Sequence, residues 1–168
     1  MALRAKPAFV FFTVLLTLGL ALGAFVGNAS ADKVHKKFKG QIITSEAPFK
    51  TSFKNAKEQI KYLSKLKKNN TFVKGKNGRW TIEYWAFLSK PLETKQAVIV
   101  FFDNTYGGEE PTEVYSTGVT PNDPYDDFVI SYVELDAEFF QPDHTYEMHI
   151  KKARNKKSLA KVEIKLVE

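Results

Sequence analysis

The chain of 168 residues contains no cysteine. That absence excludes disulfide bonds, thiolate metal sites, a cysteine nucleophile and a lipid-modified cysteine. Familiar catalytic motifs are also missing, because the sequence has no G-x-S-x-G nucleophile elbow, no H-E-x-x-H zinc pair and no glycine-rich phosphate loop. A chain of this length can still bury a full core, about 68–70% of its unfolded surface for roughly 150 residues. We therefore expect one domain that is not an enzyme.

Long apolar runs are scarce, and the sequence has one, residues 8–26. Two basic residues precede it and the small residues Ala29-Ser30-Ala31 follow it, a pattern typical of an export signal. We expect residues 1–31 to be a cleaved signal peptide and residues 32–168 to form a single domain, periplasmic or secreted. Because the run of 19 residues is also long enough to span a bilayer, an uncleaved 8–26 helix that anchors the protein in a membrane is the alternative.

Charge divides the expected mature chain into three blocks. Residues 32–79 carry 14 basic and 3 acidic residues, a net charge of +11. Residues 80–150 carry 2 and 14, which is −12, and residues 151–168 carry 7 and 2, which is +5. The blocks either form separate basic and acidic surfaces or neutralise one another as neighbours in the fold, and the sequence leaves both arrangements open.

The first block contains one amphipathic helix, expected over residues 53–68 with Ser52 as its N-cap. Its apolar residues recur at steps of three and four: Phe53, Ala56, Ile60, Leu63 and Leu66. Five lysines lie on the opposite side and are called the lysine stripe below: Lys54, Lys57, Lys61, Lys65 and Lys68. The stripe is either a solvated helix face or an electrostatic surface for an anionic polymer or membrane.

After this helix the apolar pattern changes to period two, which is typical of strands. The expected strands cover residues 38–44, 80–88, 97–102, 114–120, 128–135, 145–151 and 160–167, and Asn77-Gly78 suits a tight hairpin turn. Residues 97–102 are apolar on both faces and predict a central strand. We expect a mainly-β fold, an antiparallel immunoglobulin-like β-sandwich of about seven strands with one amphipathic helix inserted near the N-terminus of the mature chain.

The segment from Phe140 to Ile150 resembles the tyrosine corner of fibronectin type III and related immunoglobulin-like sandwiches. In that pattern an apolar residue, a proline two later and a tyrosine four beyond it precede a strand, roles that fall to Phe140, Pro142 and Tyr146. The resemblance implies that the tyrosine hydroxyl bonds to the upstream backbone and that Trp80 or Trp85 supplies a core indole. It implies no single function, since such sandwiches serve adhesion, scaffolding, sugar binding and chaperoning alike.

We expect the contacts with partners to come from the loops of residues 103–127. Their tyrosines can stack on sugars, anchor a protein partner or fold back on the core: Tyr106, Tyr115 and Tyr125. Their carboxylates are candidate calcium ligands, although no EF-hand spacing is present: Asp103, Glu109, Glu110, Asp123, Asp126 and Asp127. The polar residues Asp143, His144, Glu147 and His149 are explained by outward alternation along a strand and its turn.

These features predict a non-enzymatic binding or structural module of the cell envelope or extracellular space. It would act as a monomer without a cofactor and recognise a protein or an anionic polymer through the 103–127 loops, with the lysine stripe as a second surface. Export makes nucleic acid an unsuitable partner, and contact with a membrane is expected only during export or through the 8–26 anchor. The alternatives are a carboxylate-based hydrolase and a calcium-dependent carbohydrate-binding domain.

Overall fold

A computed structural model describes residues 28–105, 112–121, 123–153, 155 and 157–168. Within these residues the chain is mainly β, as predicted, with eight strands and two helices. The helices are α1 (Asn28–Phe38) and α2 (Ala56–Leu66). The strands are β1 (Gln41–Ser45), β2 (Thr71–Val73), β3 (Arg79–Phe87), β4 (Ala97–Asp103), β5 (Thr112–Val119), β6 (Phe128–Asp136), β7 (Thr145–Lys152) and β8 (Ser158–Val167).

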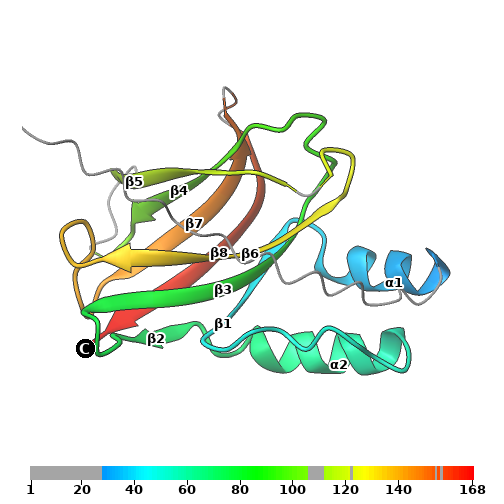
Figure 1. Cartoon of the computed structure of the whole chain (residues 1–168), viewed down its shortest axis with the longest axis horizontal. Coiled ribbons are helices and arrows are strands. Elements are labelled where there is room, and N and C mark those ends of the chain that lie inside the picture. The colour runs from blue at the N-terminus through cyan, green and yellow to red at the C-terminus, as the bar shows by residue number, and fades with distance from the viewer. Residues whose placement is uncertain (1–27, 106–111, 122, 154, 156) are drawn as a thin grey trace, which may run out of the picture.

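All the strands belong to one sheet that curls on itself, in the order β5-β4-β7-β8-β1-β3-β6, with β2 also paired to β8 (Figure 1). The two layers expected of a sandwich are thus opposite walls of one continuous sheet. Pairing is antiparallel as expected, except that β1 and β2 each lie parallel to β8. Because α2 connects β1 to β2 and a helical crossover returns the chain in its original direction, these two strands run the same way along β8.

The concave face of the curled sheet holds the larger hydrophobic core. Every second side chain along each strand points inward. Four of these are 0% exposed: Trp80 and Ile82 from β3, Phe101 from β4 and Met148 from β7. Phe140 closes this core and meets the rings of Phe101 and Tyr146 edge-on, with centroids 5.2 and 5.1 Å away. Such ring pairs add stabilisation beyond the area that they bury.

The contact implied by the tyrosine-corner resemblance is present. The backbone N–H of Gln141 donates a hydrogen bond of 2.8 Å to the hydroxyl of Tyr146. Trp80 is the indole in the concave core, and its Nε1 donates a bond of 2.7 Å to the carbonyl of Val167. Both polar groups therefore have partners although their rings are buried, which is the usual condition for a stable aromatic core.

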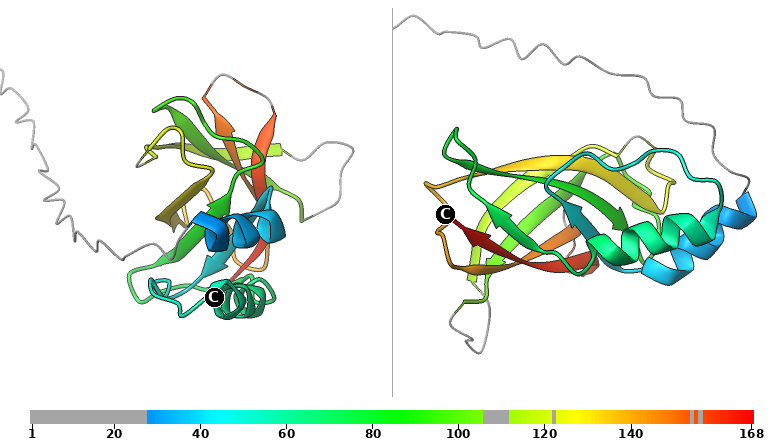
Figure 2. Two further views of the ribbon diagram at one scale, coloured as in Figure 1. Left: turned by 90° about the vertical axis from the view of Figure 1, so that its right-hand side faces the viewer. Right: turned by 90° about the horizontal axis from the view of Figure 1, so that it is seen from below.

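A second hydrophobic cluster joins the helices to the convex face of the sheet. The side views show where the two helices lie relative to the strands (Figure 2). Val34 and Phe38 of α1 and Leu63 of α2 are buried against Trp85 and Phe87 of β3. The two β3 rings stack on each other with centroids 5.3 Å apart. The helices are therefore held by packing on the outer face of β1 and β3.

The start of the described chain differs from the sequence expectation. The strand predicted over 38–44 begins at Gln41, because Phe38 is the last residue of α1. Gly40, with a φ of 77°, turns the chain from the helix into the strand in a conformation that favours glycine. The expected signal peptide lies mostly outside the described residues, and its predicted cleavage point after Ala31 falls within the first turns of α1. A chain beginning at Asp32 would keep Val34 and Phe38, the residues by which α1 packs.

The predicted amphipathic helix is present, but it is shorter than 53–68 and has a different N-cap. Asn55, not Ser52, caps α2, since its side chain accepts a bond of 3.0 Å from the N–H of Glu58. The Glu58 carboxylate in turn accepts one of 2.9 Å from the N–H of Lys54. Asn followed three residues later by Glu forms a reciprocal cap that Ser52 cannot form.

No helix in the described part of the chain is long and apolar enough to cross a bilayer.

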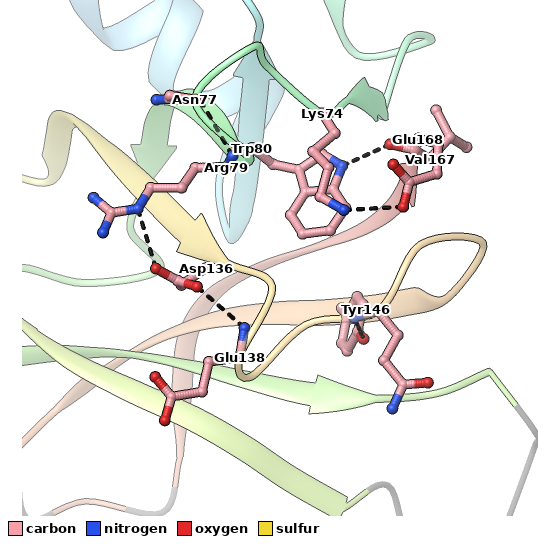
Figure 3. A network of polar contacts seen from close by, with 10 residues as sticks. Lys74, Asn77, Arg79, Trp80, Asp136, Glu138, Tyr146, Val167 and Glu168 are labelled. Atoms are coloured by element: carbon pink, nitrogen blue, oxygen red, sulfur yellow. Dashed lines mark hydrogen bonds and ion pairs between the residues drawn. The ribbon is translucent and has the colours of Figure 1, made fainter.

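The Asn77-Gly78 turn does not close the hairpin that the sequence predicts, because β2 pairs with β8 and not with β3. Charged groups of β3, β6 and the C-terminal strand meet at this end of the sheet (Figure 3). Arg79 binds Asp136 of β6 at 3.1 Å, and Lys74 binds Glu168 at 2.9 Å while lying over the Trp80 ring. Opposite charges from different blocks of the sequence are thus neighbours on the strands.

Candidate functional site

The two outermost strands of the sheet define a candidate binding site. In the described structure β5 pairs only with β4 and β6 pairs only with β3, so each has one free edge. The curl brings both edges to one side of the molecule (Figure 1). Between them lies a cavity of about 340 Å³, called the β5–β6 slot below. It is lined by Tyr84, Ile99, Tyr115, Thr117, Gly118, Val119, Thr120, Ser131, Tyr132, Val133 and Glu134.

The inward side chains of the slot follow from strand register. Thr117 lies opposite Ile99, and Ser131 lies opposite Tyr84, so these four residues share the concave face. The lining combines hydroxyl groups with small apolar side chains such as Val119. The exposed lining is more polar than apolar, and the volume lies at the lower end of the range usual for ligand sites.

Tyr84 is the most unusual residue of the slot. It is 0% exposed, and its hydroxyl oxygen has no hydrogen-bond partner among the described residues. Burial raises the pKa of Tyr84 to about 12, and the neighbouring Ser131 side chain offsets only part of that rise. The Ser131 hydroxyl is thus close, but it does not satisfy the Tyr84 hydroxyl with hydrogen-bond geometry. A buried hydroxyl without a partner costs about 1–3 kcal/mol, and a group of this kind calls for a specific explanation.

The free edges carry little charge where they face the slot, and Glu134 of β6 is the charged residue among the described lining residues. Residues 114–119 of β5 and 128–133 of β6 contain no Asp, Glu, Lys, Arg or Pro. Natural sheets usually protect exposed edges with charges, prolines or bulges, since bare edges recruit other strands. One such protective bulge is present, in the pairing of β4 with β5 at Phe101 and Phe102, near the far end of β5. On the outer face of β6, Ile130 and Tyr132 are 42% and 60% exposed.

The loop tyrosines divide between core and surface. Tyr115 packs on Phe101, Phe139 and Phe140, with ring centroids 5.3–6.2 Å away, and so it contributes to the core beside the slot. Tyr125 is 76% exposed on the connection between β5 and β6. Tyr106 lies outside the described residues.

The candidate calcium ligands do not form one metal-binding group among the described residues. Asp103 binds His144 at 2.8 Å and the N–H of Thr105 at 2.9 Å, while Asp127 lies 3.2 Å from His35. Partial burial raises the pKa of Asp103, but the hydrogen bonds from Thr105 and His144 outweigh it, so the pKa lies below its ordinary value. Glu109 and Glu110 lie outside the described residues, and the remaining candidates are Asp123 and Asp126. No group of three or more metal-ligating side chains occurs among the residues described.

Asp123, Asp126 and Asp127 nevertheless share one short turn before β6. Burial raises the pKa of Asp126 above its ordinary value, and the charges of its neighbours Asp123 and Asp127 raise it further. The side chain of Asp123 accepts a bond of 2.8 Å from the N–H of Tyr125, a contact that shapes the turn. These carboxylates therefore have local structural roles at one end of the slot.

The histidine-containing corner is occupied by structural contacts. His149 binds Glu147 at 2.9 Å and lies against the Phe102 ring, and Lys161 reaches the other Glu147 oxygen at 3.3 Å. Burial lowers the pKa of His149 despite the opposing carboxylate. Hydrogen bonds from His149 and Lys161 outweigh partial burial and lower the pKa of Glu147. This outward network joins β7 and β8 across the convex face.

All five residues of the lysine stripe are exposed. Lys57, Lys61 and Lys65 lie on α2, away from the side that packs on the sheet, and Lys54 and Lys68 flank the helix. Within the described chain, none of the five forms an ion pair. The structure thus realises both arrangements that the charge blocks left open, since the strand charges pair and the helix charges stay separate.

Sequence patterning missed the slot. Alternation places Tyr84 on the inward face with Trp80 and Ile82, but it does not show which hydroxyl lacks a partner. Adjacency of β5 and β6 depends on the curl of the whole sheet. The absence of charge from residues 114–119 and 128–133 was the available signal. No protein-family model matches the chain, and a search of curated proteins finds no similar sequence.

Proposed function

We propose that the protein is an exported, non-enzymatic binding module that accepts an extended segment of a partner polypeptide in the β5–β6 slot. The partner segment would add a strand between the two free edges. The observation that carries this proposal is the pair of free edges, with Glu134 as the one charge among the described lining residues, beside a cavity lined by Tyr84, whose hydroxyl is buried and has no partner among the described residues. β5 and the connection to β6 belong to the 103–127 region that the sequence indicates for partner contacts.

The lining is suited to peptide backbone. Residues 117–120 and 131–134 face the cavity from its two sides, and four extended residues span about 13 Å at 3.3 Å per residue. Strand addition derives affinity from main-chain hydrogen bonds and specificity from pockets for alternate side chains. The Tyr84 hydroxyl is covered by neighbouring groups, and once the inserted strand displaces them it would donate to a partner carbonyl, which removes the penalty of leaving it unpaired. Small apolar or hydroxyl side chains match the inward Thr117, Ser131 and Val133.

A tethered peptide tests the proposal, because the chain has no cysteine and a single Thr120→Cys change creates one attachment point. An octapeptide of alternating threonine and valine, flanked by lysines for solubility and ending in a cysteine activated as a mixed disulfide, would be joined there by thiol–disulfide exchange, which releases the activating thiol. Tethering supplies an effective concentration near millimolar, so a weak site still fills. Amide hydrogen exchange should slow at residues of β5 and β6 that line the slot, and the same peptide with alternate N-methylated residues should give no such protection.

Two lysine variants on neighbouring β5 residues provide the matched control. Thr117→Lys puts a charge into the slot and should abolish protection, whereas Ser116→Lys puts it on the exposed outer face and should leave protection intact. Thermal melting checks that both variants fold. Equal protection by the normal and N-methylated peptides would overturn strand addition. A dimer by light scattering with the slot amides already protected would instead assign the edges to a second copy.

A further inference from the structure

The two helices form a basic surface that the proposed strand addition does not use. α1 and α2 lie side by side at one end of the molecule (Figure 2). Ten lysines on the helices and their flanking residues are exposed and, within the described chain, form no ion pair. They are called the basic helix face below: Lys33, Lys36, Lys37, Lys39, Lys54, Lys57, Lys61, Lys65, Lys67 and Lys68.

The described acidic groups beside the helices are few and have other partners, among them Asp127, which lies 3.2 Å from His35 of α1. Glu58 is bound to Lys50 at 2.6 Å, and Glu46 accepts a bond from the N–H of Val73, so Asp32 is the remaining carboxylate of residues 28–68. The lysines are held apart from the acidic strands because both helices use their apolar sides to pack on β1 and β3. Charges concentrated on one surface create a potential that attracts an anionic partner.

The position of this face along the chain indicates what the partner is. The apolar run 8–26 ends two residues before α1 begins at Asn28. Whenever that run occupies a bilayer, chain connectivity holds both helices beside the lipid headgroups. We propose that the basic helix face rests on the anionic surface of a membrane.

The chemistry of lysine suits this contact. A lysine near an anionic bilayer strengthens association by about fivefold at low salt, and its methylene stem can lie along apolar surface while the ammonium stays hydrated. Two membrane signals, an apolar segment and a basic patch, also hold a protein more firmly than either does alone. A free anionic polymer would use the same charges, but it would not require the adjacent apolar run.

The full chain, with no native cysteine, permits a direct test in vesicles. A Ser64→Cys variant places a fluorescent label beside the lysine stripe without removing a charge, and Ser116→Cys labels β5 as the matched control. Both proteins would be reconstituted into vesicles of phosphatidylcholine alone or with about 30% phosphatidylglycerol. Quenching by the neutral quencher acrylamide should fall about threefold or more at position 64 in the anionic vesicles, since a docked helix is shielded from water. It should be unchanged at position 116.

Salt and charge variants decide the interpretation. Raising the salt from about 0.05 M to 1 M shortens the screening length to about 3 Å and should restore quenching at position 64. The quadruple change K57Q/K61Q/K65Q/K68Q should give the same accessibility in both kinds of vesicle. The wild-type salt series remains decisive if the quadruple variant fails to fold. Equal quenching at position 64 in neutral and anionic vesicles, or an equal fall at both positions, would overturn the proposal.

Discussion

Replacing Tyr84 with phenylalanine should stabilise the folded protein, although most core substitutions destabilise. The hydroxyl oxygen is buried and has no hydrogen-bond partner among the described residues, whereas in the unfolded chain water satisfies it. Its burial therefore costs about 1–3 kcal/mol, and phenylalanine removes that cost while keeping the ring. After allowing for the small void left by one oxygen atom, we expect the free energy of unfolding to rise by about 1 kcal/mol.

Tyr146→Phe is the matched control, because Tyr146 is also buried in the concave core, at 1% exposure. Its hydroxyl accepts the 2.8 Å bond from the N–H of Gln141, so the same chemical change leaves a donor unpaired. We expect Tyr146→Phe to destabilise by about 1–3 kcal/mol. The two substitutions thus differ in sign although each removes one buried hydroxyl.

Urea unfolding followed by tryptophan fluorescence measures both effects, with equal m-values confirming that the unfolded states are comparable. A change of 1 kcal/mol shifts the melting temperature by about 4 °C for a domain of this size, which calorimetry resolves. If Tyr84→Phe destabilises as much as Tyr146→Phe, the Tyr84 hydroxyl has a partner in the folded state and the reasoning is refuted. The tethered octapeptide should protect the slot amides of Tyr84→Phe from exchange less than those of the wild type. In the variant, one peptide carbonyl loses the Tyr84 hydroxyl as its hydrogen-bond donor.

Three further predictions concern the helix cap, the core and pH. Asn55→Ala should destabilise by about 1 kcal/mol in urea unfolding while Ser52→Ala has no effect, and the reverse order would return the N-cap to Ser52. Phe140→Ala should destabilise by about 3–5 kcal/mol, while Phe139→Ala, at a side chain 47% exposed, should destabilise far less; similar melting curves for the two would contradict the assigned core. Burial lowers the pKa of His149 from 6.5, so the folded state binds protons less readily than the unfolded state, and stability should fall as the pH drops below 6.5. His149→Gln should reduce that fall in stability between pH 6.5 and 4.5. The lowered pKa values of the Asp103 and Glu147 carboxyls lie below this window. An unchanged stability profile in the variant would show that another group titrates.

Alternation and turn chemistry were sufficient to locate six of the strands, since those segments are apolar on the face that packs inward. Phe38 shows where such patterns fail: an apolar residue followed by Gly40 and Ile42 fits a strand, but packing with Val34 on the convex face makes it the end of α1. The N-cap of α2 was mispredicted because Ser52 and Asn55 are both suitable cap residues, and only Asn55 has Glu58 at the spacing for a reciprocal bond.

The amino-acid sequence alone determined the mainly-β character, the amphipathic helix, the lysine stripe and the bond between the Tyr146 hydroxyl and the upstream backbone, because each depends on residues close together in the chain. The continuous curled sheet, the parallel pairing with β8 and the β5–β6 slot depend on segments far apart in the chain. Tyr84 combines the two levels. Its inward orientation follows from period-two alternation, but the lack of a partner for its hydroxyl is decided by the side chains that surround it after the sheet has curled.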